Sequence, residues 1–320
     1  MRSKLRLGIL GTGVAARELY LPALKRLRHR IELVACANRT RSKARDYARL
    51  AGISRVVADA EALFALPDVD AILISLPIVA QPPMVLAALA AGKPVLSEKP
   101  IGPTMAAGRR LLRTAARFPV PWLIGENYAF MAHVHHLRRW IDAGRLGDIR
   151  VVQVFDMSLV DGKNPYFHTR WRKKPAHVGG FVVDAGVHVA DVVRRCFGVP
   201  TEIRSHVASF EPSLLPIDTA VATLRWQSGA VGTWTSCFSA RYDGPMLRVY
   251  GSRANAELDR STATLWEAGG RRSSYRSKTN SFAAQFSHFA DVVQRGAPIA
   301  FTPAEALSDL ELMQAIVRGR

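Results

Sequence analysis

The chain has 320 residues, a length that fits two domains, and its 48% hydrophobic and 22% charged residues are ordinary proportions for a globular protein. No apolar run approaches the ~18 to 20 residues that cross a bilayer, so we expect no membrane partner. The net charge of +18 is spread along the chain rather than gathered on one element with exposed aromatic residues. We interpret it as solvated helix faces with some attraction for an anionic cofactor or substrate, and expect no nucleic-acid partner.

The first 126 residues alternate between short apolar runs, rich in Val, Ile and Leu, and segments with helical periodicity. The runs that predict strands are 5–10, 31–37, 55–58, 71–77, 94–98 and 120–126. The helical segments lie near 15–27, 41–50, 59–65, 81–91 and 104–117. Apolar runs without polar alternation, separated by helices, are typical of a parallel sheet that helices cover on both faces.

The pattern changes after a predicted helix at 131–144. Segments of alternating polarity follow at 148–160, 218–240 and 245–259, and the second of them contains a Gln-Ser-Gly turn that predicts a hairpin. Such alternation indicates an antiparallel sheet with one face covered by helices and one face open.

Later helices are predicted at 179–198, 281–296 and 302–319. Thr302 followed by Pro303 makes a good start for the last one. The fold class is therefore α/β. An N-terminal domain, residues 1–120, has a doubly wound parallel sheet, and an α/β domain, residues 121–320, has a large open, mostly antiparallel sheet.

The first predicted strand runs directly into GTGVAA, residues 11–16, which approaches the pattern G-x-G-x-x-G/A. In that pattern Gly11 permits a tight turn, Gly13 lets a pyrophosphate approach the backbone, and Ala16 permits close packing of helix and strand. The following helix offers its first N–H groups and the positive end of its dipole to phosphates. The motif predicts a Rossmann domain that binds a dinucleotide.

Asn38 stands where a carboxylate that binds the adenosine ribose is expected, about 20 residues further on at the end of the second strand. Arg39 follows it. A carboxylate would repel a 2′-phosphate, whereas a guanidinium can form a bidentate contact with one. The sequence thus favours NADP(H), with NAD(H) possible; the alternative is that Arg39 is a solvated loop residue.

The fifth predicted strand ends in Glu98, Lys99 and Pro100. Ligands of open parallel sheets bind beyond the carboxyl ends of the strands, so Lys99 is a candidate for the cofactor crevice. It could also be an exposed loop lysine paired with Glu98.

The predicted helix at 179–198 carries Asp184 and His188, which lie one turn apart on the same helical face. Taken alone, the pair also fits a helix-capping carboxylate and a core histidine. Its interpretation therefore depends on the rest of the chain.

Four blocks occur in order: GTGVAA, DAILISLP, AALAAGKPVLSEKP and WRKKPAHVGGFVVDAGVHVAD. Together they resemble the Gfo/Idh/MocA family of oxidoreductases, named for glucose–fructose oxidoreductase and inositol dehydrogenase, over nearly the whole chain. The resemblance implies a Rossmann domain followed by an α/β domain whose open sheet face makes oligomer contacts, hence a homodimer or homotetramer. It also implies hydride transfer between NAD(P) and a secondary alcohol or ketone of a sugar, cyclitol or nucleotide-sugar derivative.

The resemblance implies that Lys99 lies by the nicotinamide and the reacting oxygen, and that the Lys99–Pro100 bond is cis. Asp184 and His188 match the family's D-x-x-x-H motif, as in inositol dehydrogenase rather than the members that carry Tyr. With Lys99 and a dinucleotide site on the same chain, we interpret His188 as the acid–base for the hydroxyl proton. Asp184 would orient it, and Lys99 would stabilise the developing alkoxide.

Two features depart from a single family pattern. Gln81 stands where many members carry His. Residues 125–136, GENYAFMAHVHH, are similar to the E-N-x-x-F-x-x-H pattern of nucleotide-sugar 3-ketoreductases, which usually have Tyr in place of His188. The substrate indications therefore point in two directions.

The expected site residues fall into two groups. The cofactor contacts are Gly11, Thr12, Gly13, Val14, Ala15, Asn38, Arg39, Ser75, Leu76, Pro77, Gln81, Glu98 and Lys99. The substrate contacts are Asn127, Tyr128, His168, Arg172 and His177. The alternative function is a non-catalytic dinucleotide-binding sensor, which would have no need of the proton-transfer residues.

Cys36, Cys196 and Cys237 lie far apart in apolar settings without metal-ligand spacing, so we expect no metal site and free, buried thiols in a reducing cytoplasm. The N-terminus has a basic start, but its apolar stretch breaks at Gly11 and Gly13 without a small-residue cleavage site. No signal peptide is expected.

Overall fold

The computed structural model describes residues 4–319, which divide into two compact units. Each unit consists of two stretches of the chain. The first comprises the described residues up to Asn127 and Asn280–Leu307, and the second Tyr128–Thr279 and the residues from Ser308 onward. Across residues 4–319 no helix has both the length and the apolar character that a membrane span needs.

Residues 280–307 pack with the first unit although they follow most of the second in sequence. Their helix α9 (Ser281–Arg295) places Phe286 and Phe289 in the core of the first unit. Asp291 of the same helix forms an ion pair of 2.7 Å with Arg30. This arrangement differs from a single boundary near residue 120, because the apolar face of α9 completes the first core.

A six-stranded parallel sheet forms the centre of the first unit, in the order β3-β2-β1-β4-β5-β6. The strands are β1 (Leu5–Leu10), β2 (Ile31–Ala37), β3 (Arg55–Val56), β4 (Ala71–Ile74), β5 (Val95–Glu98) and β6 (Trp122–Gly125). Strands β4 and β6 are buried throughout, as expected where helices cover both faces. The structure confirms the predicted doubly wound sheet; β1 and β4, where the strand order reverses, lie at its centre.

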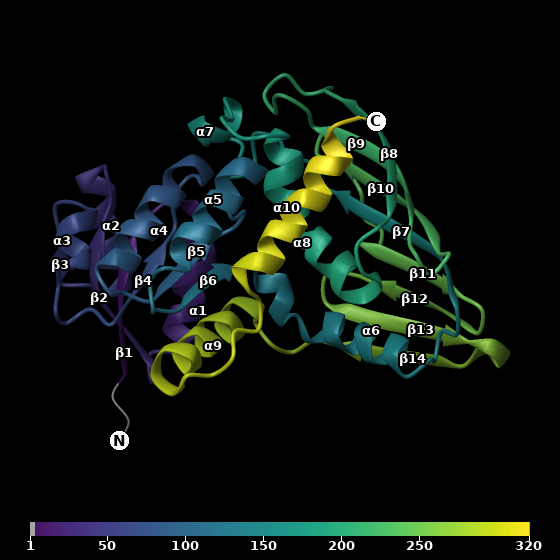
Figure 1. Ribbon diagram of the computed structural model, residues 1–320, viewed down its shortest axis with the longest axis horizontal. Helices are drawn as coiled ribbons and strands as arrows, with labels where there is room; N and C mark the ends of the chain where they lie inside the picture. The colour runs from purple at the N-terminus through teal and green to yellow at the C-terminus, as the bar shows by residue number, and fades with distance from the viewer. Residues whose placement is uncertain (1–3, 320) are drawn as a thin grey trace. The chain divides into compact units, whose positions relative to one another are not determined.

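Helices cover both faces of this sheet (Figure 1). Besides α9 they are η1 (Ala16–Tyr20), α1 (Leu21–Arg26), α2 (Arg41–Ala51), α3 (Ala60–Phe64), η2 (Ile78–Ala80), α4 (Gln81–Ala90) and α5 (Met105–Ala115). Leu7 and Ile9 of β1 point into the core beneath η1, α1, α2 and α9, whereas Gly8 between them faces Leu63 of α3. The predicted helix at 15–27 contains a π-helical turn, η1.

An eight-stranded sheet forms the centre of the second unit, in the order β14-β13-β12-β11-β7-β10-β9-β8. The strands are β7 (Ile149–Met157), β8 (Glu202–Ala208), β9 (Thr219–Arg225), β10 (Val231–Cys237), β11 (Leu247–Gly251), β12 (Ala254–Leu258), β13 (Thr262–Glu267) and β14 (Arg272–Arg276). Neighbours are antiparallel except β7 and β10. The hairpin β9–β10 is confirmed, and buried Ala222 and Leu224 alternate with exposed Val221 and Thr223, which leaves one sheet face open.

Helices lie on the other face of this sheet (Figure 1). The helices of the second unit are α6 (Ala132–Asp142), α7 (Arg170–Lys173), α8 (Gly180–Phe197), the short turn η4 (Ala268–Gly270), and most of η3 (Asn127–Phe130) and α10 (Pro303–Val317). Helix α6 contacts β12, β13 and β14, and α8 contacts β7 and β10. The predicted mostly antiparallel sheet, with one covered and one open face, is confirmed.

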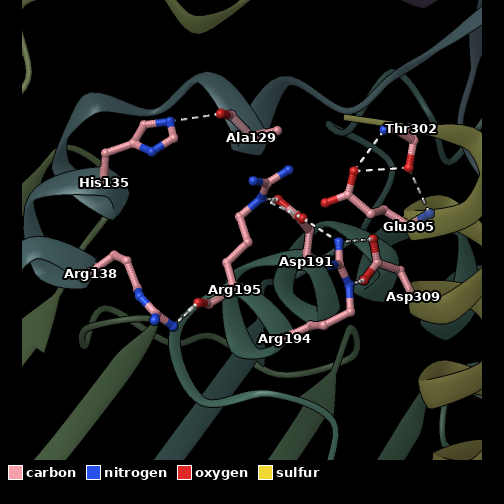
Figure 2. Close-up of polar contacts among 9 residues, drawn as sticks. All are labelled: Ala129, His135, Arg138, Asp191, Arg194, Arg195, Thr302, Glu305 and Asp309. Carbon is pink, nitrogen blue, oxygen red and sulfur yellow. Dashed lines mark hydrogen bonds and ion pairs between the residues drawn. The ribbon is translucent and has the colours of Figure 1, made fainter. Parts of the chain in front are cut away.

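A buried ion network fixes the carboxyl-terminal half of α8 (Figure 2). Asp191, fully buried, accepts hydrogen bonds from Arg194 Nη2 at 2.9 Å and Arg195 Nε at 2.7 Å. Arg194 Nε also donates to Asp309 of α10 at 2.7 Å, and Arg138 of α6 donates to the carbonyl of Arg195 at 2.6 Å. A buried carboxylate is stable only with such partners, so Asp191 has a structural role.

Two sequence-level details are also confirmed. Thr302 and Glu305 form a capping box at the start of α10: the Thr302 N–H donates to Glu305 Oε2 at 2.8 Å, and the Glu305 N–H donates to Thr302 Oγ1 at 3.2 Å (Figure 2). Cys36, Cys196 and Cys237 are free and buried.

Candidate active-site residues

The glycine loop after β1 owes its shape to Gly11 and leaves open space at Gly13. Gly11 has φ +93°, and a Cβ there would lie 2.1 Å from the carbonyl oxygen of Ser75, which follows β4. Only glycine allows this close approach of the two loops. At Gly13, which is exposed, a Cβ would meet nothing within 4 Å. The loop thus combines a tight turn with room for a ligand against the backbone.

Four buried polar side chains of the first unit have groups without a hydrogen-bond partner within the described residues: Thr12, Tyr47, Gln81 and Gln285. Two of them follow strands of the parallel sheet: Thr12, through its hydroxyl, and Gln81, through both atoms of its amide. Such groups are unfavourable unless a ligand or water satisfies them. Thr12 lies between the two loop glycines, and Gln81 opens α4 after β4. The orphaned groups fit a ligand rich in hydrogen-bonding atoms, as a dinucleotide is.

The end of β2 is basic and has no carboxylate. Asn38 accepts a hydrogen bond of 3.4 Å from the Thr12 N–H and donates one of 3.1 Å to the Thr40 carbonyl, while Arg39 is exposed. Arg17, from the turn η1, donates to the carbonyl of Thr12 at 3.4 Å and to that of Lys43 at 3.3 Å. Arg17 therefore bridges the glycine loop and the first turn of α2. Sequence reasoning missed it, although a basic residue just after the glycine motif is a usable signal.

Glu98 and Lys99 stand at the carboxyl end of β5, both partly buried. The Lys99–Pro100 bond is cis, which confirms the expectation. Glu98 accepts a hydrogen bond from the hydroxyl of Tyr20. Lys99 thus directly follows the end of strand β5 and is partly buried, whereas the alternative expected an exposed loop lysine.

Two glycines set the start of α8, on which the candidate acid–base pair lies. Gly179 and Gly180 have φ of +72° and +52°, and a Cβ on Gly180 would lie 2.5 Å from the Leu215 carbonyl oxygen. The helix then follows with Asp184 buried and His188 partly exposed. The residues on either side of His188 are buried, so the imidazole is a partly accessible side chain on an otherwise buried stretch of helix.

Asp184 forms an ion pair with Arg172, which precedes α8. Arg172 Nε lies 2.7 Å from Asp184 Oδ2, and the two side chains are 15% and 6% exposed. The guanidinium also lies over the rings of Trp171 at 4.0 Å and Tyr166 at 4.6 Å. Arg172, expected to contact substrate, here neutralises and positions the Asp184 carboxylate. No sequence pattern indicated this pair, because Arg172 lies on the short helix α7, apart from α8 in the sequence.

His188 stacks on Tyr128, with ring centroids 4.7 Å apart and planes at 17°. The structure thus brings together two residues predicted separately, one for catalysis and one for substrate contact. Stacking fixes the plane of the imidazole. The ring is partly exposed, whereas the alternative interpretation expected a core histidine.

The remaining predicted substrate residues lie in three different settings. Asn127 is buried in the first unit, where its amide donates to Ser281 Oγ at 2.9 Å. His177 is buried at the start of α8 and donates to the Gly180 carbonyl at 3.0 Å. His168 is exposed and donates to the Gly162 carbonyl at 2.7 Å.

His133, the histidine of the E-N-x-x-F-x-x-H segment, is 2% exposed on α6, and neither ring nitrogen has a partner among the described residues. Burial lowers its pKa, an effect larger than the opposing influence of Asp259. A neutral imidazole inside the second unit serves packing. The segment therefore resembles the nucleotide-sugar pattern in sequence, but its histidine is buried inside the second unit.

The sequence matches the description "Oxidoreductase family, NAD-binding Rossmann fold" over residues 5–125 and "Oxidoreductase family, C-terminal alpha/beta domain" over residues 138–319. The crystal structure of an oxidoreductase from Thermotoga maritima is 32% identical, with a TM-score of 0.94 over 99% of this chain and 97% of that one. A dTDP-3,4-didehydro-2,6-dideoxy-alpha-D-glucose 3-reductase from Saccharopolyspora spinosa is 28% identical over 81% of this chain and 76% of its own. A 1,5-anhydro-D-fructose reductase from Ensifer adhaerens is 28% identical over 78% and 74%.

Proposed function

The chain belongs to the Gfo/Idh/MocA family of oxidoreductases and binds a nicotinamide dinucleotide, and we propose that it interconverts a secondary alcohol and a ketone on a sugar, cyclitol or nucleotide-sugar derivative. The observation that carries this proposal is the accessible His188, one turn from a buried Asp184 that Arg172 holds in place. Two similar proteins named as reductases of sugar derivatives support the substrate class.

His188 moves the hydroxyl proton in this proposal. An imidazole titrates near neutral pH, so it can accept the proton during oxidation and return it during reduction. Asp184, four residues earlier on the same helical face, orients the ring and stabilises the imidazolium. Stacking on Tyr128 restricts the ring to one plane, so that proton transfer needs no reorientation.

Lys99 stabilises the negative charge that develops on the substrate oxygen as the proton leaves. A fixed ammonium contributes most when that charge is largest, in the transition state. The bound nicotinamide supplies the hydride acceptor or donor. Thr12 and Gln81, with their orphaned polar groups, and the backbone around Gly13 would hold the dinucleotide.

We propose a preference for NADP(H). Three observations support it: Asn38 replaces a ribose-binding carboxylate, Arg39 is exposed beside it, and Arg17 links the glycine loop to α2. Helix α2 also begins without a side-chain cap at Thr40, which leaves its first N–H groups available to an anion.

The direct test is a screen of polyols, aldoses and nucleotide sugars that follows the nicotinamide absorbance of wild type and Lys99→Met. Turnover of one class by wild type, lost in Lys99→Met while dinucleotide binding persists, supports the proposal. Binding of dinucleotide with no turnover of any class would favour the non-catalytic sensor.

We also propose that the chain forms a homodimer or homotetramer through the open sheet face. We propose a cytoplasmic location as well, in keeping with the three free cysteines.

A further inference from the structure

Tyr20 connects the glycine-loop helix to the strand end that carries Lys99. It is the last residue of the π-helical turn η1, is 2% exposed, and donates its hydroxyl hydrogen bond to Oε1 of Glu98. Glu98 directly precedes Lys99 in sequence. A hydrogen bond to a carboxylate therefore joins the helical turn after the glycine loop to the end of β5, next to Lys99.

The position of the Tyr20 ring is fixed by helix α9. The ring meets Phe282 edge to face, with centroids 5.7 Å apart and planes at 64°, and Phe286 at 5.4 Å and 86°. Such edge-to-face contacts are favourable for the aromatic quadrupole and restrict rotation of the ring. Because a phenol hydroxyl lies in the plane of its ring, a fixed ring also fixes the direction of the hydrogen bond.

The turn that presents Tyr20 is itself unusual. A π-helical turn is less stable than an α-helical one and is found mostly as a single turn, frequently at functional sites. One residue more per turn changes the direction of the side chains that follow by about 100°. Here that change falls just before α1, at Tyr20, and the side chain reaches Glu98 on β5.

The neighbouring strand lies close to this contact. Gly125 of β6 pairs with Glu98, and a Cβ there would lie 3.1 Å from the Ser97 carbonyl oxygen and 3.7 Å from both the Tyr20 hydroxyl and Gln285 Nε2. Both atoms of the Gln285 amide are buried without a partner in the described residues. The Tyr20 ring thus packs in the apolar core, while a glycine and a polar side chain lie beside its hydroxyl.

We propose that Tyr20 is a positioning residue for the oxidoreductase reaction. Its hydrogen bond holds the Glu98–Lys99 segment against the glycine-loop helix, so that the Lys99 ammonium is placed before substrate binds. Catalytic groups need to be held within a fraction of an ångström, and a neighbouring hydrogen bond is the usual means. The inference rests on the role proposed above for Lys99.

Tyr20→Phe tests the hydrogen bond while keeping the ring and its aromatic contacts. The matched control is Tyr47→Phe, in α2 of the same unit, which removes a hydroxyl that is equally buried but has no partner in the described residues. Hydrogen–deuterium exchange of the cofactor-free protein is the first measurement. We expect faster exchange in residues 95–103 of Tyr20→Phe, with other segments unchanged, and no such local effect in Tyr47→Phe.

Steady-state kinetics is the second measurement. We expect kcat of Tyr20→Phe to fall about tenfold, the net worth of one hydrogen bond to a charged group, with the KM for NADPH nearly unchanged. Tyr20→Phe and Glu98→Leu together should lose little more than Glu98→Leu alone, since both remove the same bond. Exchange and kcat equal to those of Tyr47→Phe would overturn the inference.

These outcomes separate the inference from the proposed function. If wild type turns over no sugar, the exchange measurement still decides whether Tyr20 holds residues 95–103. If Tyr20→Phe does not fold, Glu98→Leu, which removes the acceptor, is measured in the same way, and unchanged exchange in that segment overturns the inference.

Discussion

The glycine loop of the first unit and helix α8 of the second unit both carry residues of the proposed reaction, but they do so in different ways. In the glycine loop the chemistry lies in the backbone: Gly11 permits a turn that no side chain would fit, and Gly13 leaves space. In α8 the chemistry lies in side chains, and the backbone is a regular buried helix with Asp184 and His188 on one face.

The difference teaches how each region can be disturbed. A backbone site depends on the absence of side chains, so an added methyl group is the sharpest probe. A side-chain site depends on partners from elsewhere, and α8 has them: Arg172 on Asp184 and Tyr128 on His188. Substitution of a partner should therefore affect α8, whereas the glycine loop should respond mainly to its own residues.

The largest effect is expected at α8 itself. His188→Asn should lower kcat by roughly 10² to 10⁴, the range for a positioned proton-transfer group, with substrate affinity changed far less. Asp184→Asn should be intermediate, since the imidazole remains but loses its orienting carboxylate. The rates are measured at saturating substrate together with the thermal unfolding midpoint. If the His188→Asn variant partly unfolds and its folded fraction keeps full activity, His188 is a structural residue and not the acid–base.

In the glycine loop, two alanine substitutions should separate fold from binding. Gly11→Ala forces a Cβ to 2.1 Å from the Ser75 carbonyl oxygen at φ +93°, so it should destabilise the cofactor-free protein by about 1–3 kcal/mol or more. Gly13→Ala meets nothing within 4 Å, so it should leave that stability unchanged and weaken NADPH binding. Denaturant unfolding and calorimetric titration measure the two quantities. Equal destabilisation by both variants would contradict a binding role for the space at Gly13.

Cofactor preference should depend on the basic end of β2. Arg39→Ala should remove most of a preference for NADPH over NADH, since one charge-assisted contact with a phosphate contributes about 1.5 to 3 kcal/mol, or roughly ten- to a hundredfold. NADH affinity should stay the same and serves as the internal control. Equal affinity of wild type for both cofactors would contradict the proposal at once.

The smallest effect is a pH dependence of stability at His133. Burial lowers the pKa of its imidazole in the folded protein below the usual value of 6.5, so the unfolded chain binds a proton more readily. The stability that the buried neutral ring contributes is present above about pH 6.5 and is lost as the pH falls toward the lowered pKa. His133→Leu should flatten the decline of the urea midpoint between about pH 7 and 5, whereas substitution of the exposed His206 should not. Identical slopes would show that other groups cause the decline.

The sequence by itself determined the elements and the backbone motif. Continuous apolar runs predicted the six parallel strands, and runs of alternating polarity predicted the second sheet. A strand buried on both faces is apolar throughout, whereas a strand buried on one face alternates, so the local sequence shows the difference. The glycine loop could also be found, since a positive φ at Gly11 requires a particular residue type at a particular position. Asp184 and His188 could be paired because helical periodicity alone puts them on one face.

Only the tertiary structure decided which side chains serve these residues. Tyr20 contacts Glu98 across 78 positions of sequence, and Arg172 of the short helix α7 contacts Asp184 of α8. Helix α9 completes the first core although it follows the second sheet in the sequence. Arginine and tyrosine are common on helices and loops, and nothing local distinguishes the one that finds a carboxylate. Such contacts depend on how distant elements pack. A hydrogen bond or ion pair forms only between groups that are close in space, and local periodicity of the sequence does not encode that proximity.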